Sequence, residues 1–325
     1  MAQIGEIDFF LPSRSLNNDE IAKKFPDWSA EKIAKKTGIK TRHISGENEF
    51  VSDLAVSAGE KFFKANDVNR DDIDFILLCT QSPDYPFPAT ACIIQERLKI
   101  PKSAGALDYN LGCSGYIYGL AIARSLVDTG ISRNLLLITS ETITKYIGED
   151  DKGNQTLFGD AAAVTLVTES EHPSIGPFVF GTNGGGMNSI IAKKDLRGHQ
   201  FSEIPYNKRT GTLSMNGPEV FQFSLSVVPT LVKDVLHKAG LDNSDINYFV
   251  FHQANAYMLT QIRKRLGIEK ERFLIDMADV GNTVASSIPI VLKNMRSRDQ
   301  LKPGTRVLLA GFGVGLSWGA CIVEF

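Results

Sequence analysis

The feature that most constrains the fold of this chain is an internal repeat. The segment DDIDFILLCTQS at residues 71–82 is echoed by SDINYFVFHQAN at residues 244–255. Each copy follows a polar stretch that reads as the end of a helix, at Lys64-Ala65 in the first copy and at Lys238-Ala239 in the second. Because there are only two copies, the repeat predicts a duplicated domain rather than a solenoid.

The repeat extends to two residues that carry reactive groups. The stretch ALDYNLGCSG at residues 106–115 aligns within one residue with LIDMADVGNT at residues 274–283. This alignment gives Cys113 and Asn282 equivalent positions in two halves. We expect these halves to span residues 1–170 and 171–325.

The pattern of apolar runs indicates an α/β fold. In each half, runs of four to six apolar residues alternate with longer helical patterns, which is typical of crossover units on mixed, mostly parallel sheets. The helix expected after Cys113 has almost no polar face over residues 116–123. A helix of that kind must be covered on all sides. We therefore expect it to pack between two sheets against the helix that follows Asn282, where Pro289 either kinks that helix or lies in its first turn.

Composition excludes several classes of protein. The chain has 325 residues, 43% of them hydrophobic, and a net charge of −2. This near balance gives no support to nucleic-acid binding, and no apolar stretch approaches the length of a membrane span. Four cysteines without a Cys-x-x-Cys pair predict free thiols rather than disulfides or a metal site. We expect a cytoplasmic protein without a metal.

Three separated residues could together perform acyl chemistry. Cys113 lies at a strand-to-helix junction, where free amide N–H groups and the helix dipole favour a thiolate, so we expect a lowered pKa. His252 ends an apolar run that reads as a strand, and Asn282 lies in a glycine-flanked turn. A thiol, an imidazole and an amide are sufficient for a covalent thioester mechanism. Taken singly, each residue also has a purely structural interpretation.

A glycine-rich run near the C-terminus supplies backbone donors. The run GFGVG at residues 311–315 ends another expected strand, and glycine allows its amides to point into a pocket. The amides of Val314 and Cys113 could form an oxyanion hole. The run is a poor dinucleotide fingerprint, because no helix with an acidic partner follows it. We expect no bound cofactor.

These residues belong to motifs that resemble a known family. The chain is similar to the thiolase superfamily, and within it to the β-ketoacyl-acyl-carrier-protein synthase III group of condensing enzymes. Seven ordered motifs carry the resemblance: KKTGIKTRHI (35–44), PFPATAC (86–92), GCSG (112–115), FGDAAAV (158–164), HQAN (252–255), GNT (281–283) and GFGVGLSWGA (311–320).

The resemblance implies a five-layered αβαβα fold, a homodimer and a catalytic triad. The triad maps onto Cys113, His252 and Asn282. Cys113 would take an acyl group from a thioester, and a malonyl thioester on acyl-carrier protein would then lose carbon dioxide. His252, as a neutral donor, and Asn282 would stabilise the enolate, which attacks the acyl group on Cys113.

The resemblance also suggests residues that contact substrates. Phe87 matches a position that reaches the acyl pocket of the partner subunit, although it could equally anchor a Pro-Phe-Pro loop. Arg263, Lys264 and Arg265 could steer an acidic carrier protein, although a solvated helix face would look the same. The polar segment 192–206 is expected to shape the rim of the pocket.

Several residues depart from the pattern of the family. A coenzyme A clamp in this family places a Trp where this chain has Lys32, and Trp28 lies one helical turn earlier. Lys36 and Lys152 stand where Arg is usual, and lysine lacks the planar fork that grips phosphate. Tyr257 replaces an Arg that contacts the carrier protein. These departures favour a specialised member that takes its acyl group from a carrier protein or an unusual coenzyme A thioester.

Three functions are compatible with these observations. The first is decarboxylative condensation in fatty-acid or natural-product biosynthesis. The second is transfer of the acyl group from Cys113 to an alcohol or amine on the same fold, and the third is a catalytically silent partner subunit. The intact triad makes the silent subunit the least favoured. The sequence does not specify the length or type of the acyl chain.

Overall fold

The computed structural model describes residues 1–172, 174–193 and 212–325, and a five-stranded mixed sheet forms the frame of the first half. Its strand order is β1-β7-β6-β4-β5. The β1–β7 and β7–β6 pairs are antiparallel, whereas the β6–β4 and β4–β5 pairs are parallel. The strands are β1 (Ala2–Phe10), β4 (Phe75–Cys79), β5 (Gly105–Tyr109), β6 (Asn134–Glu141) and β7 (Ala161–Glu169).

The sheet of the second half repeats this arrangement. Its order is β12-β11-β13-β14-β8, with β8 and β14 in antiparallel pairs and β11, β12 and β13 in parallel pairs. The α/β class and mixed sheets are therefore confirmed, but the expectation of mostly parallel sheets was wrong. Each sheet has two antiparallel and two parallel pairs, because β6–β7 and β13–β14 follow one another without a crossover that returns to the same end of the sheet. The strands are β8 (Ile175–Thr182), β11 (Tyr248–Phe251), β12 (Phe273–Leu274), β13 (Arg306–Gly313) and β14 (Ser317–Glu324).

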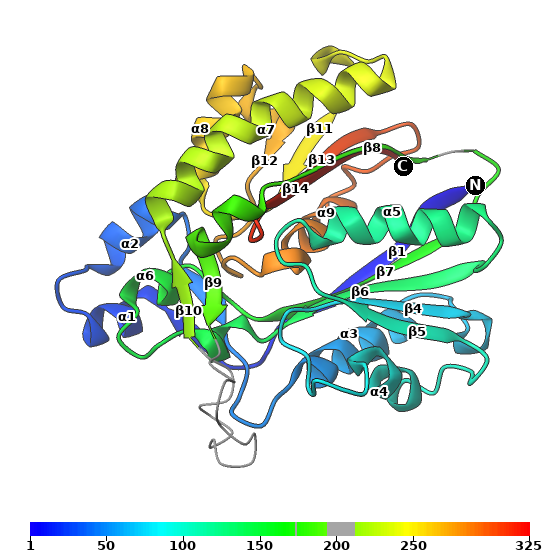
Figure 1. The fold of residues 1–325 in the computed structure, drawn as a ribbon, viewed down its shortest axis with the longest axis horizontal. Coiled ribbons are helices and arrows are strands. Elements are labelled where there is room, and N and C mark those ends of the chain that lie inside the picture. Colours follow the sequence, from blue (N-terminus) through cyan, green and yellow to red (C-terminus); the bar gives the residue numbers. More distant parts are fainter. Residues whose placement is uncertain (173, 194–211) are drawn as a thin grey trace.

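Helices fill the space between the two sheets and cover their outer faces, so that the fold has five layers (Figure 1). Helices α3 and α4 cover the first sheet, α5 and α9 lie between the sheets, and α7 and α8 cover the second. The helices are α1 (Asn18–Lys24), α2 (Ala30–Thr37), α3 (Val51–Ala65), α4 (Thr90–Arg97), α5 (Gly115–Asp128), α6 (Lys152–Gln155), α7 (Gly217–Ala239), α8 (Ala256–Leu266) and α9 (Ser287–Ser297).

The central layer is apolar, as the sequence predicted. Tyr116, Ile117 and Leu120 of α5 share one buried cluster with Ile288 and Val291 of α9. All five side chains are fully buried, and strands of both sheets contribute to the same cluster. Pro289 lies in the first turn of α9, where its missing N–H breaks no helical hydrogen bond. Burial of this layer brings together the N-terminal ends of α5 and α9.

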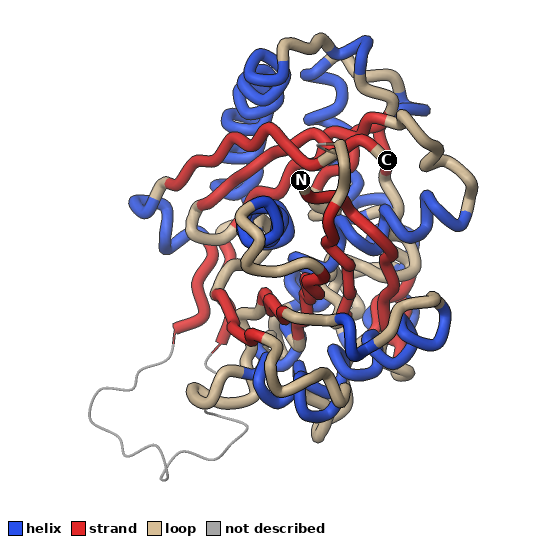
Figure 2. The backbone as a smooth tube through the Cα atoms, turned by 90° about the vertical axis from the view of Figure 1, so that its right-hand side faces the viewer, coloured by secondary structure: helices blue, strands red, loops and turns tan. Residues whose placement is uncertain are grey.

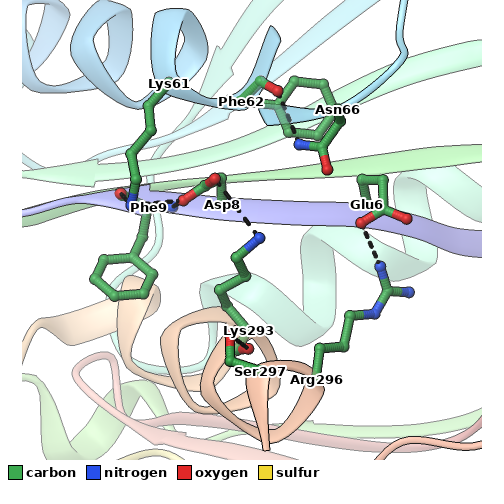
Figure 3. A network of polar contacts seen from close by, with 9 residues as sticks. All are labelled: Glu6, Asp8, Phe9, Lys61, Phe62, Asn66, Lys293, Arg296 and Ser297. Atoms are coloured by element: carbon green, nitrogen blue, oxygen red, sulfur yellow. Dashed lines mark hydrogen bonds and ion pairs between the residues drawn. The ribbon is translucent and has the colours of Figure 1, made fainter. Parts of the chain in front are cut away.

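Ion pairs connect α9, in the central layer, to the first sheet (Figure 3). Asp8 of β1 is 1% exposed and contacts Lys61 of α3 at 2.8 Å and Lys293 of α9 at 3.6 Å. Nearby, Arg296 of α9 contacts Glu6 at 2.9 Å. A buried carboxylate needs such partners to offset the loss of water. These contacts fix α9, from the second half, against the sheet of the first half.

Smaller elements surround the ends of the strands. The β2–β3 pair joins Ser15–Asn17 to Thr41–His43, and the β9–β10 pair joins Ile190–Lys193 to Thr212–Met215. Figure 2 shows the β9–β10 pair extending from the layered body. Residues 194–206 of the expected pocket rim lie outside the described residues. No helix in the described part of the chain has the length and apolar character required to cross a bilayer.

The remaining described elements are short 3-10 helices. They are η1 (Arg70–Asp72), η2 (Ile143–Tyr146), η3 (Gly184–Ser189), η6 (Asn243–Asp245), η7 (Lys270–Arg272) and η8 (Val284–Ser286). Two of them matter for the site described next. The η2 helix follows β6, and the η8 helix leads directly into α9.

Candidate active site

Cys113 lies just before α5 and is 8% exposed. The glycine-rich end of β13 passes directly beside it. A Cβ atom on Gly313 would lie 3.0 Å from the Cys113 Sγ, and one on Gly311 would lie 2.8 Å from the Cys113 carbonyl oxygen. Only glycine allows so close an approach of a strand to the sulfur. The glycine run therefore packs against the sulfur.

Two backbone N–H groups face the sulfur of Cys113. Burial raises the pKa of the Cys113 thiol to about 12, while hydrogen bonds from the Val314 and Cys113 backbones act to lower it. The two amides expected to form an oxyanion hole therefore both lie beside the reacting atom. The expectation of a thiolate, however, was wrong. Removal of the sulfur from water outweighs the stabilisation by N–H groups, so the resting group is a neutral thiol.

This raised pKa has a consequence for alkylation of Cys113. Because only the thiolate reacts with iodoacetamide, its rate of labelling should rise about tenfold per pH unit from pH 6 to pH 9, with no plateau. Peptide mass spectrometry can follow Cys113 alone. Exposed Cys92 is removed by Cys92→Ala to simplify the labelling. A plateau near neutral pH would show that Cys113 is a thiolate.

His252 follows the last residue of β11 and is 2% exposed. Its backbone N–H donates to the Ala310 carbonyl at 2.8 Å, and its ring packs edge-on against Phe312. Its Nδ1 lies 2.8 Å from the Ser287 Oγ. Burial lowers the pKa of His252 to about 4, although a hydrogen bond with the Val284 backbone acts to raise it. The imidazole is therefore neutral near pH 7, as expected.

Asn282 is held by both its backbone and its side chain. Its backbone N–H donates to the Leu157 carbonyl at 2.9 Å, and its carbonyl accepts from Gly159 at 3.0 Å. Its Oδ1 accepts from the Val284 N–H at 3.0 Å, whereas its Nδ2 makes only a 3.4 Å contact with the Ala254 carbonyl. The amide is thus oriented through its oxygen. Its Nδ2 keeps capacity to donate to a further group.

The structure brings Cys113, His252 and Asn282 to the wall of one cavity of about 180 Å³. A second cavity, of about 650 Å³, also begins at Cys113. Both cavities are lined by Cys113, Phe158 and Ile190. The sulfur therefore lies between a small chamber that contains the imidazole and amide and a larger chamber with a mainly apolar wall. This arrangement suits a group that is held covalently while a second substrate enters.

The larger cavity is lined in part by side chains that no sequence motif indicated. Tyr85 comes from the loop after β4, Ile143 and Tyr146 come from η2, and Leu213 comes from β10. They are far apart in sequence and belong to no periodic pattern. Ser287, which contacts His252, was also missed. The one sequence feature that could have indicated Ser287 is the pair Ser286-Ser287 shortly after the GNT motif.

Trp28 is surrounded by three lysine side chains. The ammonium groups of Lys32, Lys36 and Lys152 lie 5.5, 5.1 and 5.3 Å from the centre of its ring. Lys152 also pairs with Asp27. The structure therefore places the expected clamp residues Trp28, Lys36 and Lys152 together and adds Lys32. An aromatic ring bordered by ammonium groups can hold a planar base near a phosphate.

Phe87 and the basic residues of α8 line neither cavity. Phe87 is 85% exposed. In α8, Lys264 and Arg265 are exposed, whereas Arg263 donates to the Ile268 carbonyl at 2.7 Å and so helps to end the helix. Tyr257 lines the smaller cavity and stacks on Phe221 with ring centres 5.6 Å apart. In the described ranges no group of three or more acidic, His or Cys side chains could hold a metal ion.

Comparison with protein-family models gives two matches on this chain. The model for 3-oxoacyl-[acyl-carrier-protein] synthase III matches residues 107–184, and the model for the C-terminal part of that synthase matches residues 236–325. The chain is 34% identical to the β-ketoacyl-[acyl-carrier-protein] synthase III of Neisseria meningitidis serogroup A, over 100% of this chain and 99% of the relative. It is 35% identical to the enzyme of that name from Caldanaerobacter subterraneus, over 97% of this chain and 95% of the relative.

Solved structures agree with these matches. A crystal structure of a 3-oxoacyl-(acyl-carrier-protein) synthase III superposes with a TM-score of 0.95 and 45% identity, covering 100% of this chain and 99% of the other. The synthase III of Thermus thermophilus superposes with a TM-score of 0.90 and is 33% identical, and the match covers 99% of each chain. A priming β-ketosynthase from a polyketide pathway superposes with a TM-score of 0.91 and is 29% identical, and the match covers 100% of this chain and 96% of the other.

Proposed function

Because this chain belongs to the 3-oxoacyl-[acyl-carrier-protein] synthase III family of the thiolase superfamily, we propose that Cys113, His252 and Asn282 catalyse its condensation. The family consists of condensing acyltransferases, and this chain is one of them. The observation that carries the assignment of residues is their shared cavity of about 180 Å³, with Cys113 also facing the larger one. No cofactor takes part in the mechanism, because thioester substrates supply the reactive groups.

In the first half-reaction, Cys113 takes an acyl group from a thioester. Its Sγ attacks the thioester carbonyl carbon, and the oxygen of that carbonyl becomes negatively charged. The N–H groups of Val314 and Cys113 face the sulfur and donate to this oxygen. Fixed N–H donors in a water-poor site stabilise such an oxyanion because they need no reorganisation. The acyl chain then occupies the larger cavity, whose wall includes Ile143, Phe158 and Leu213.

In the second half-reaction, a malonyl thioester enters the smaller cavity. His252 and Asn282 donate to its thioester carbonyl, which stabilises the enolate that remains after carbon dioxide leaves. Asn282 suits this role because its Oδ1 is held by the Val284 N–H and its Nδ2 can turn toward the substrate. The enolate carbon attacks the acyl carbonyl on Cys113, and a β-ketoacyl thioester leaves. The neutral state of His252 avoids protonation of the enolate by an imidazolium.

Acyl-carrier protein and a second copy of the chain are the proposed partners, in the cytoplasm. The carrier protein, which is acidic, would contact the basic end of α8 at Lys264 and Arg265, with Arg263 in a supporting position. Phe87 suits a subunit interface, because a phenyl ring that is 85% exposed is costly to leave in water. Phe87 lies in the same loop as Tyr85, which lines the larger cavity, and this placement supports a role at the acyl pocket of the partner.

The cluster around Trp28 suits the nucleotide end of coenzyme A. We expect Trp28→Ala to raise the KM for an acyl-coenzyme A thioester about tenfold, because it removes a stacking surface flanked by cations. The KM for the same acyl group on a carrier protein should change little. Lys35→Ala is the matched control, because Lys35 is exposed on α2, the helix that carries Lys32 and Lys36, and its ammonium group does not lie over the ring. Equal effects on both donors would contradict a coenzyme A site.

Two measurements test the proposed condensation. Incubation with acyl thioesters should add one acyl group to Cys113, seen by intact mass and peptide mapping. Addition of malonyl-acyl-carrier protein labelled at its free carboxyl group should then release labelled carbon dioxide and give a β-ketoacyl product. Loading without decarboxylation, with transfer of the acyl group to an alcohol or amine, would instead support the acyltransferase alternative.

A further inference from the structure

Ser287 is the first residue of α9 and is 2% exposed. Three polar atoms surround its Oγ. The His252 Nδ1 and the Val284 carbonyl oxygen each lie 2.8 Å from it, and the Gln253 backbone nitrogen lies at 3.2 Å. In the described chain, no other side chain is hydrogen-bonded to the imidazole of His252. Ser287 is thus the side-chain partner of Nδ1, and the Val284 backbone is a further hydrogen-bond partner of the ring.

The hydrogens available at Ser287 determine which nitrogen of His252 is protonated. A hydroxyl group has one hydrogen and two lone pairs. The Gln253 N–H can only donate to the Oγ, and the Val284 carbonyl can only accept from it. With its hydrogen on that carbonyl, the Oγ has one lone pair left, which accepts from Nδ1. In this arrangement Nδ1 carries the proton of the neutral imidazole, and Nε2 carries a lone pair.

The first half-reaction requires a group that accepts the proton of Cys113, and an unprotonated Nε2 is such a group. Cys113 rests as a neutral thiol because it is buried, so its proton must be taken up when the sulfur attacks a thioester. His252 lines the same cavity as Cys113, and its Nδ1 edge is turned to Ser287. The condensation step requires the opposite tautomer, with a hydrogen on Nε2. One imidazole must therefore accept in the first half-reaction and donate in the second.

We propose that Ser287 is a positioning residue that sets the tautomer of His252 for each half-reaction. With the Ser287 hydrogen on the Val284 carbonyl, Nε2 accepts the proton of Cys113 during acyl loading. With that hydrogen turned to Nδ1, the Nε2–H donates to the enolate oxygen during condensation. The proposal deepens the proposed function and rests on it, because it assigns both half-reactions to the same imidazole.

The protons balance in both half-reactions. During loading, the bond between Sγ and the acyl carbon forms and the bond between the donor sulfur and that carbon breaks. The Cys113 proton passes through Nε2 to the departing sulfur, which leaves as a thiol. During condensation, carbon dioxide leaves, the new carbon–carbon bond forms, and Cys113 departs as a thiolate that takes one proton from water. Exchange between tautomers moves one proton between the ring nitrogens through water.

The first test is a direct observation of the tautomer in the free enzyme. The chain has five histidines, so ¹⁵N-histidine labelling gives few signals, and His252→Asn identifies those of His252. The two neutral tautomers have distinct imidazole ¹⁵N shifts. We expect Nδ1–H in the free wild-type enzyme. An Nε2–H tautomer there would overturn the proposal, even if every variant failed to fold.

The second test compares Ser287→Ala with Ser286→Ala. Ser286 is the matched control, because it is equally buried and precedes Ser287 directly, yet its Oγ contacts Thr139 rather than His252. We expect Ser287→Ala to shift the His252 tautomer signals and to slow acyl loading about tenfold or more in a rapid-quench mass assay. Ser286→Ala should leave both unchanged.

The outcomes separate this proposal from the proposed function. If wild-type enzyme loads and condenses but Ser287→Ala matches Ser286→Ala in tautomer signals and loading rate, the role of Ser287 is wrong and the condensation stands. If wild-type enzyme forms no adduct on Cys113, the proposed function fails, and the assigned step at Nε2 fails with it. A tautomer shift with no change in loading would refute the role of Nε2 as the proton acceptor.

Discussion

Replacement of Cys113 by alanine is expected to abolish acyl loading and to reduce condensation by at least about a thousandfold. The alanine side chain cannot form a thioester, and no other thiol lines either cavity in the described chain. The fold should tolerate the change, because the sulfur occupies a small site and the larger cavity already lies beside it. Intact mass after incubation with an acyl thioester measures loading, and product formation measures condensation.

Cys92→Ala is the matched control for this experiment. Cys92 is the exposed cysteine of the described chain, and it lies on α4, away from both cavities. This variant should load and condense at the wild-type rate. An acyl adduct that persists on Cys113→Ala and disappears from Cys92→Ala would show that Cys92, and not Cys113, is the nucleophile.

The second large effect is expected for Asn282→Asp. Aspartate retains an acceptor for the Val284 N–H, which Asn282 now holds at 3.0 Å, so the local backbone should be preserved. It replaces the Nδ2 donor by an oxygen and adds negative charge where the enolate develops. Removal of one donor to a developing oxyanion costs about a hundredfold to a thousandfold in rate, and the added charge should push the loss toward the upper end.

Loading and decarboxylation should separate in this variant. The acyl adduct on Cys113 should still form, while release of labelled carbon dioxide from malonyl-acyl-carrier protein should fall about a hundredfold or more. The adduct thus provides an internal control for folding and for an intact nucleophile. Carbon dioxide release at the wild-type rate would show that Asn282 does not stabilise the enolate.

Much of the fold could be predicted from the repeat. The polar stretches at Lys64-Ala65 and Lys238-Ala239 do end α3 and α7. The two sheets have corresponding strand orders, and the apolar helix after Cys113 does share a buried layer with α9. These features depend on the period of apolar residues along the chain, which the sequence displays directly. We propose that the halves meet at residues 170 and 171, between β7 and β8.

The surroundings of the site were harder to predict. Trp28 and Lys152 are separated by more than a hundred residues, and only the fold brings the start of α6 beside the segment that precedes α2, so that the ammonium group lies over the ring. The side chains of the larger cavity come from a loop, a 3-10 helix and a short strand pair. No periodic pattern links such segments, because each is placed by the layers beneath it.

The sequence by itself determined the reactive groups and the duplicated frame that carries them, since both follow from residue identity and short-range periodicity. Only the tertiary structure decided the protonation of Cys113. The position of Cys113 before a helix indicated a thiolate, yet enclosure by β13 and the layers around α5 makes it a neutral thiol. The reason is that the free energy of a charge depends on how much water surrounding segments remove, which is a property of the folded whole.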